Sequence, residues 1–193
     1  MAIIIVSGLP RSGTSLMMQM LQAGGLEILA DEHRPADPDN PQGYFEYEPV
    51  KYLRTDNSWV YQAEGRVVKV ISALLPHLPP DLTYRIIFMK RPMVEMLASQ
   101  RAMLKRLKRQ GSTADDQTLG KIFGRQLAQT DLWLARQAHI TVLSVNYRDV
   151  LQDPESSASL VARFIGLPLK IAEMAAVVDP NLYRQKLSNT IAV

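Results

Sequence analysis

Short apolar runs alternate with amphipathic stretches along most of the chain. Four of these runs are rich in β-branched residues and have the continuous apolar character of strands buried on both faces. They are Ile3–Val6, Val67–Ile71, Tyr84–Met89 and Thr141–Val145. Strands of this kind pair in parallel, so we expect a sheet covered by helices on each side.

Apolar residues at spacings of three and four predict helices after the strands. The predicted helices are Ser15–Leu21, Met93–Leu107, Leu119–Arg136, Pro154–Ile165 and Lys170–Val177. Because strands and helices alternate, the sequence predicts an α/β fold in three layers, with a parallel sheet of four to five strands flanked by helices.

Composition limits the number of domains and the possible chemistry. A chain of 193 residues, 47% of them hydrophobic, fits one core, so we expect a single domain over residues 1–193. The chain has no cysteine, which excludes disulfides, thiolate metal sites and cysteine nucleophiles. Its three histidines, His33, His77 and His139, are too scattered to indicate a metal cluster. We therefore expect no bound metal.

Charge and hydropathy also restrict the partners. The formal net charge of +3 is compatible with an anionic ligand but too small to indicate a nucleic-acid partner. The N-terminus has no basic segment before its short apolar run, which indicates a first strand rather than a signal peptide. No stretch approaches the roughly 18 to 20 apolar residues that span a membrane. We expect a cytoplasmic protein with no membrane partner.

The segment Gly8–Ser15, which reads Gly-Leu-Pro-Arg-Ser-Gly-Thr-Ser, lies where the first strand ends and a helix begins. A glycine-containing loop in this position can turn its backbone N–H groups inward, and the positive end of the helix adds to the attraction for an anion. The pattern predicts a phosphate- or sulfate-binding loop. The alternative interpretation is an ordinary tight turn between a strand and a helix.

This loop differs from the loop of ATP-hydrolysing enzymes. Thr14 stands where those enzymes have a lysine, and the strand Tyr84–Met89 is followed by Lys90 and Arg91 instead of a magnesium-binding aspartate. A phosphosulfate donor has no β,γ-diphosphate for a magnesium ion to bridge, and fixed cationic side chains can neutralise its leaving phosphate. The loop therefore favours such a donor over ATP.

The sequence Pro10-Arg11-Ser12-Gly13-Thr14 resembles the donor loop of the sulfotransferase superfamily, which has a P-loop-like fold. The continuation Thr14-Ser15-Leu16-Met17 is most similar to the tyrosylprotein sulfotransferase branch. The resemblance implies that 3′-phosphoadenosine 5′-phosphosulfate (PAPS) is the co-substrate and 3′-phosphoadenosine 5′-phosphate (PAP) the product. It implies donor binding by the whole loop: Pro10, Arg11, Ser12, Gly13, Thr14 and Ser15.

Two later elements extend this resemblance. The family binds the 3′-phosphate of its donor through an arginine after a strand and a serine eight residues later, and Arg91 and Ser99 have this spacing. The segments Asn146–Pro154 and Phe164–Pro168 are similar to the Tyr-Glu-Asp-Leu, Asp-Pro and Phe-Leu-Gly-Leu-Pro sequences that follow the last main strand. The resemblance places Tyr147 near the donor nucleotide.

The resemblance also implies catalytic roles. Counted from the shared loop, Glu32 is the general base of the tyrosylprotein branch and Arg34 its neighbouring cation. Arg11 and Lys69 would stabilise the charge that builds on the leaving phosphate. Lys69 is also an isolated cation in an apolar strand, so its alternative role is a strand-end side chain that reaches water. Other candidates for the base are His33, Glu46 and Glu48.

The chain departs from the family at two places. Ile71 stands where cytosolic sulfotransferases have their base histidine, and their C-terminal Arg-Lys-Gly-x-x-Gly segment is absent. Tyr183, Arg184 and Lys186 are candidates to replace that segment. The sequence thus favours a metal-independent sulfotransferase that acts on a hydroxyl or amine acceptor. The alternatives are a non-catalytic nucleotide-binding module and, with less support, a P-loop kinase.

Overall fold

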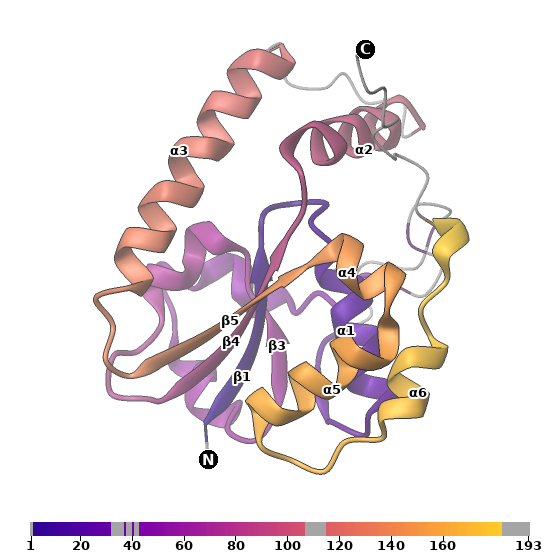
Figure 1. Ribbon diagram of the computed structural model, residues 1–193. Helices are drawn as coiled ribbons and strands as arrows, with labels where there is room; N and C mark the ends of the chain where they lie inside the picture. The colour runs from indigo at the N-terminus through magenta and orange to yellow at the C-terminus, as the bar shows by residue number, and fades with distance from the viewer. Residues whose placement is uncertain (1, 32–36, 38–39, 41–42, 107–114, 183–193) are drawn as a thin grey trace.

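The computed structural model describes residues 2–31, 37, 40, 43–106 and 115–182. Its centre is a five-stranded sheet in the order β2-β3-β1-β4-β5, in which every pairing is parallel (Figure 1). The strands are β1 Ile3–Gly8, β2 Ile28–Leu29, β3 Val67–Lys69, β4 Tyr84–Lys90 and β5 Ile140–Asn146. The predicted α/β class, with a parallel sheet of four to five strands flanked by helices, is confirmed.

The register brings the ends of four strands to one edge of the sheet. Val6 of β1 pairs with Lys69, which ends β3, and Gly8 pairs with Met89 of β4. Lys90, at the end of β4, pairs with Asn146, at the end of β5. Ligands of open parallel sheets bind at this carboxyl edge, so the register already locates the site.

Two hydrophobic cores lie on the two faces of the sheet. The first contains Ile3, Ile5 and Phe88 and is covered by short 3₁₀ helices and the last turns of α3. The second contains Ile4, Val6 and Ile87 and is covered by α1, α5 and α6 (Figure 1). These covering elements are η1 Glu48–Tyr52, η2 Ser58–Gln62, η3 Ser72–His77, α1 Thr14–Ala23, α3 Asp116–Leu134, α5 Pro154–Ile165 and α6 Ile171–Ala176. Successive residues of β1 alternate between the cores, as the two-residue period of a strand requires.

Helix α2, Met93–Arg106, crosses above the carboxyl edge and contacts α3, which rises beside it (Figure 1). The short helix α4, Tyr147–Gln152, follows β5 directly, and η4, Pro180–Leu182, is the last described element. Because α2 begins just after β4 and lies over the sheet edge, it can place side chains above the loop that follows β1.

Several predicted boundaries are wrong by a few residues, and β2, α4 and the described 3₁₀ helices were not predicted. The predicted strand Val67–Ile71 ends at Lys69, because Ile71 is 46% exposed and immediately precedes η3. Helix α3 begins three residues earlier than predicted, where the Asp115 carboxylate accepts a hydrogen bond of 2.7 Å from the Thr118 N–H. Strand β2 has two residues, too few for a pattern, and α4 was likewise missed. No described helix is both long and apolar enough to span a membrane.

Candidate functional site

The loop after β1 has the conformation that its two glycines allow. Gly8 and Gly13 have φ angles of 152° and 101°, in the region where side chains are disfavoured. A Cβ at Gly8 would lie 2.5 Å from Ser12 Oγ and 2.8 Å from the Met89 carbonyl oxygen, and a Cβ at Gly13 would overlap the Tyr147 ring. Both positions therefore require glycine, and the second brings the loop against the first residue of α4.

Two residues of the loop have features that a simple turn does not need. Arg11 has a φ of 66°, a left-handed conformation that costs an ordinary residue about 1–2 kcal/mol. The hydroxyl of Ser12 is buried and has no hydrogen-bond partner within the described part of the chain. Buried polar atoms are normally paired, and an anion held by the loop would supply the missing partner. The loop thus fits the phosphate-binding role predicted for it.

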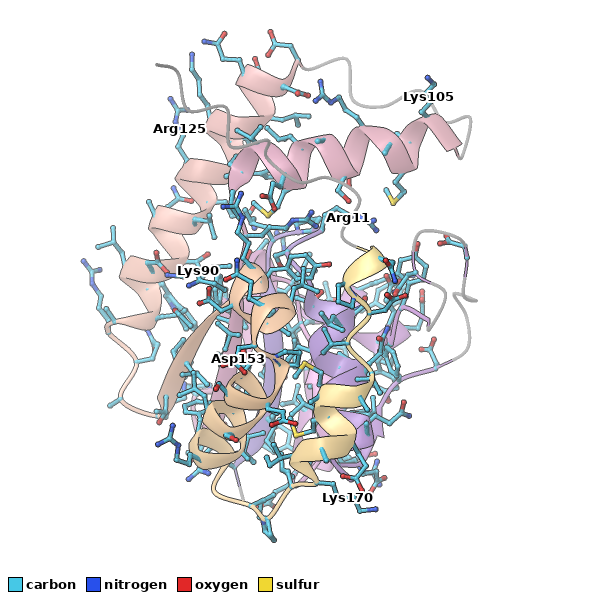
Figure 2. All side chains as sticks on the ribbon, turned by 45° about the vertical axis from the view of Figure 1, so that its right-hand side comes forward. Arg11, Lys90, Lys105, Arg125, Asp153 and Lys170 are labelled. Carbon is cyan, nitrogen blue, oxygen red and sulfur yellow. The ribbon has the colours of Figure 1, made fainter. Side chains whose placement is uncertain are left out.

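Arg11 connects the loop to α2. Its Nε donates a hydrogen bond of 3.0 Å to Ser99 Oγ, and its Nη1 lies 3.9 Å from the sulfur of Met103. Figure 2 shows Arg11 beneath α2, whereas Lys170 lies at the opposite end of the molecule. The structure therefore joins the two elements that the sequence predicted to bind the donor.

Arg91 follows β4 and lies at the centre of a wider network. Its Nη1 donates to the carbonyl oxygen of Arg11 over 3.3 Å, and its guanidinium stacks on the ring of Tyr147 with the Cζ atom 4.6 Å from the centroid. Its Nε forms an ion pair of 3.1 Å with Glu95, and both side chains are buried. These contacts give Arg91 one orientation at the carboxyl edge.

Glu95 and Arg148 were not predicted, yet they complete this network. Glu95, in the first turn of α2, also accepts from Arg148, whose Nε lies 3.0 Å from Glu95 Oε1 and whose Nη2 contacts the same oxygen. The signal in the sequence was the spacing of four residues between Arg91 and Glu95 near a helix start, which is typical of an ion pair. Arg148 had no comparable signal, because it comes from a distant segment.

Lys69, the last residue of β3, contacts the segment that contains Tyr44. Its Nζ donates to the carbonyl oxygen of Tyr44, and Ser15 Oγ donates to the same oxygen over 3.5 Å. The Tyr44 hydroxyl lies 2.9 Å and 2.8 Å from the two carboxylate oxygens of Asp37. Lys69 is the last residue of an interior strand, so its side chain extends toward the site rather than from an outer edge of the sheet.

These side chains surround one cavity of about 380 Å³, within the range of small-molecule sites. Most of the predicted residues line it: Pro10, Arg11, Gly13, Thr14, Ser15, Lys69, Arg91, Ser99 and Tyr147. Ser12 is buried inside the loop itself. Lys90, which the sequence grouped with Arg91, is exposed and does not line the cavity.

The candidates for the base divide into two groups. Glu32, His33 and Arg34 lie outside the described residues, as do Tyr183, Arg184 and Lys186. Glu46 lines the cavity, whereas Glu48 does not and instead forms an ion pair of 2.5 Å with Lys51. Among the described candidates, only Glu46 is placed to contact a molecule in the cavity. No described group of three or more acidic or histidine side chains could hold a metal ion.

The cavity combines cationic side chains with two carboxylates, those of Glu46 and Asp179. Arg11, Lys69 and Arg91 give the cavity three cationic groups, and the N-terminus of α1 adds its partial positive charge. Groups fixed in this way can neutralise charge that develops on a leaving phosphate oxygen, without moving during the reaction. The site suits the binding of an anionic group.

The model of one protein family, described as the sulfotransferase domain, matches residues 2–190 of the chain. No curated protein matches the sequence of this chain.

Solved structures with the same fold are distant in sequence. A sulfotransferase from Mycobacterium tuberculosis H37Rv is 19% identical with a TM-score of 0.55, and the alignment covers 92% of this chain and 70% of that one. The sulfotransferase domain from the curacin biosynthetic pathway is 13% identical with a TM-score of 0.53, over 96% and 92% of the two chains. Retinol dehydratase in complex with androsterone and PAP is 16% identical with a TM-score of 0.52; the alignment covers 91% of this chain but only 62% of that one.

Proposed function

The chain belongs to the sulfotransferase domain family, and from this premise we propose that it moves a sulfuryl group from PAPS to a hydroxyl or amine acceptor, without a metal ion. The observation that carries the proposal is that the loop after β1, Arg91 and Ser99 line the same cavity. These are the two elements that the family uses to hold the two phosphate ends of its donor. We also propose that residues 1–193 form one sulfotransferase-like domain.

The proposed roles follow the positions of the side chains. The loop residues Pro10–Ser15 would hold the 5′-phosphosulfate end, and Arg91 and Ser99 would hold the 3′-phosphate. Tyr147 lies between these regions, because its ring contacts both Gly13 and Arg91. This arrangement supports recognition of a nucleotide with phosphates on both sides of its ribose.

In the reaction, the acceptor oxygen or nitrogen forms a bond to sulfur while the bond from sulfur to the bridging phosphate oxygen breaks. PAP leaves with the electron pair of that bond, and Arg11 and Lys69 stabilise the negative charge on its phosphate. The proton of the acceptor goes to a carboxylate. We assign this role to Glu32 with Arg34 beside it, on the resemblance to the tyrosylprotein branch, and Glu46 is the alternative because it lines the cavity.

The proposal is tested by measuring PAP formation from PAPS in the presence of a metal chelator. The acceptor panel should contain a tyrosine peptide, a carbohydrate, a phenol and an amine. We expect turnover with one class of acceptor, at a rate that the chelator does not change. Binding of PAP without turnover on any acceptor would favour the non-catalytic module, and turnover of ATP only with magnesium would favour the kinase.

The same assay assigns the base. If Glu32 accepts the proton, Glu32→Gln lowers kcat by about 10²- to 10⁴-fold and leaves PAP affinity unchanged, while Glu46→Gln has a much smaller effect. The reverse result would assign the role to Glu46. Glu48→Gln is the matched control, since Glu48 carries the same carboxylate outside the cavity.

A further inference from the structure

Glu95 is a buried carboxylate that serves two arginines. Its side chain is 1% exposed, and the side chains of its partners Arg91 and Arg148 are 7% and 37% exposed. Both carboxylate oxygens accept hydrogen bonds from these arginines: Oε2 accepts from Arg91 Nε over 3.1 Å, and Oε1 accepts from Arg148 Nε over 3.0 Å. Removal of a carboxylate from water is unfavourable unless cations and hydrogen bonds compensate it, and these two arginines do so.

The cluster contains more positive than negative charge. One carboxylate and two guanidinium groups give the cluster of Arg91, Glu95 and Arg148 a net charge of +1. Glu95 also lies in the first turn of α2, where the positive end of the helix favours a carboxylate. Two guanidinium groups and the helix start thus all attract the Glu95 carboxylate.

Glu95 does not line the cavity, although Arg91 does. Arg91 therefore connects Glu95 to the cavity, because it both lines the cavity and pairs with Glu95. The guanidinium of Arg91 forms an ion pair with Glu95, donates a hydrogen bond to the carbonyl oxygen of Arg11 and stacks on the Tyr147 ring. Of these three contacts, the one to Glu95 pairs two full charges in a buried place, so it is the strongest restraint on Arg91.

We propose that Glu95 is a positioning residue that fixes Arg91 for the 3′-phosphate of the donor, and so makes the site selective for nucleotides that carry this group. The inference rests on the proposed function, because it requires that Arg91 binds the 3′-phosphate. It adds a residue that the ligand does not touch.

The proposal makes a prediction opposite in sign to that of simple electrostatics. A carboxylate next to a phosphate site repels the phosphate, so its neutralisation to glutamine should tighten binding if charge alone matters. If Glu95 instead orients Arg91, the same substitution releases the guanidinium and weakens binding. The direction of the change therefore separates the two explanations.

The test compares the affinities of PAP and adenosine 5′-monophosphate, which lacks the 3′-phosphate, by calorimetry. Glu95→Gln is expected to weaken PAP binding about tenfold or more and to change the affinity for the monophosphate by less than about threefold. Glu95→Asp, which keeps the charge, should recover part of the loss. The matched control is Glu155→Gln, the same change at an exposed position in the first turn of α5, which should alter neither affinity.

Two further measurements keep the test decisive. In an Arg91→Lys background, Glu95→Gln should cause no further loss of PAP affinity, because the group that it orients is already gone. Thermal unfolding identifies variants that do not fold. If Glu95→Gln does not fold, the affinities are compared in Glu95→Asp instead. Unchanged or tighter PAP binding, or an equal loss for both nucleotides, would overturn the role of Glu95. Failure of the unmodified protein to bind PAP would overturn the proposed function itself.

Discussion

The guanidinium of Arg11 donates a hydrogen bond of 3.0 Å to the hydroxyl of Ser99, across 88 residues of sequence. One residue belongs to the loop after β1, and the other lies in the second turn of α2. The contact joins the two halves of the proposed donor site, so a change at either residue should affect binding at both.

Ser99→Ala removes the hydroxyl that accepts from Arg11 and that would donate to the 3′-phosphate. We expect PAP affinity to fall by roughly 3- to 10-fold, the usual effect of one lost hydrogen bond. Calorimetry with PAP checks this. Ser144→Ala is the control, because Ser144 is exposed on β5 and lies outside the cavity. An equal effect of both substitutions would exclude a specific role for Ser99.

Gly13→Ala should prevent donor binding and lower the thermal midpoint. The added Cβ would overlap the Tyr147 ring, and the φ of 101° strains any residue with a side chain. Gly124→Ala is a matched control inside α3, where a Cβ meets nothing within 4 Å. It should be neutral or stabilise by up to about 1 kcal/mol. If Gly13→Ala bound PAP normally, the described loop geometry would be wrong.

Lys69→Met should lower kcat by about 10²- to 10³-fold, with a much smaller change in PAP affinity, if Lys69 stabilises charge in the transition state. The substitution keeps the unbranched shape of the side chain and removes its charge. Steady-state kinetics with PAPS provides the measurement, and Lys90→Met is the control at an exposed lysine outside the cavity. A loss of affinity without a loss of kcat would assign Lys69 to binding alone.

Asp153 caps α5, and its carboxylate accepts a hydrogen bond of 3.0 Å from the Ser156 N–H. Hydrogen bonds from Ser156 lower the pKa of Asp153 below its ordinary value. A lowered pKa stabilises the folded state above the unfolded pKa of about 4, and this contribution is lost as the pH falls through the folded value. Asp153→Ala should therefore lower the thermal midpoint at pH 7 and have a smaller effect at pH 3.

Thermal unfolding at both pH values tests this prediction. Asp131→Ala, at an exposed position inside α3, is the control and should have little effect at either pH. An effect of Asp153→Ala that is as large at pH 3 as at pH 7 would show that the ionised carboxylate is not what stabilises the helix start.

The sequence predicted the elements whose patterns are local. The buried strands have continuous apolar runs, and Pro154–Ile165 was predicted with its observed bounds because a proline starts it and a glycine ends it. Strand β2 could not be predicted, since a two-residue strand exists only through its pairing with β3. Phe88 shares a core with Ile3 and Ile5 through the register of β4 against β1, which the sequence did not predict.

The candidate site could be predicted where family spacing supplied it, at the loop and at Arg91 and Ser99. The contacts between these residues could not be predicted from the sequence. The bond from Arg11 to Ser99 and the pairing of Glu95 with Arg148 join segments that are distant in sequence, and they depend on how α2 and α4 lie over the sheet edge. The assignment of Glu32 as the base stays a prediction, because that residue lies outside the described part of the chain.

The most direct test of the central claim is calorimetric titration of the unmodified protein with PAP in the absence of magnesium, with magnesium-ATP titrated alongside. The proposed donor site predicts micromolar binding of PAP, a much weaker response to magnesium-ATP, and a loss of PAP affinity in Arg91→Ala. Failure to bind PAP, or tighter binding of magnesium-ATP, would contradict the assignment of this protein as a PAPS-dependent sulfotransferase.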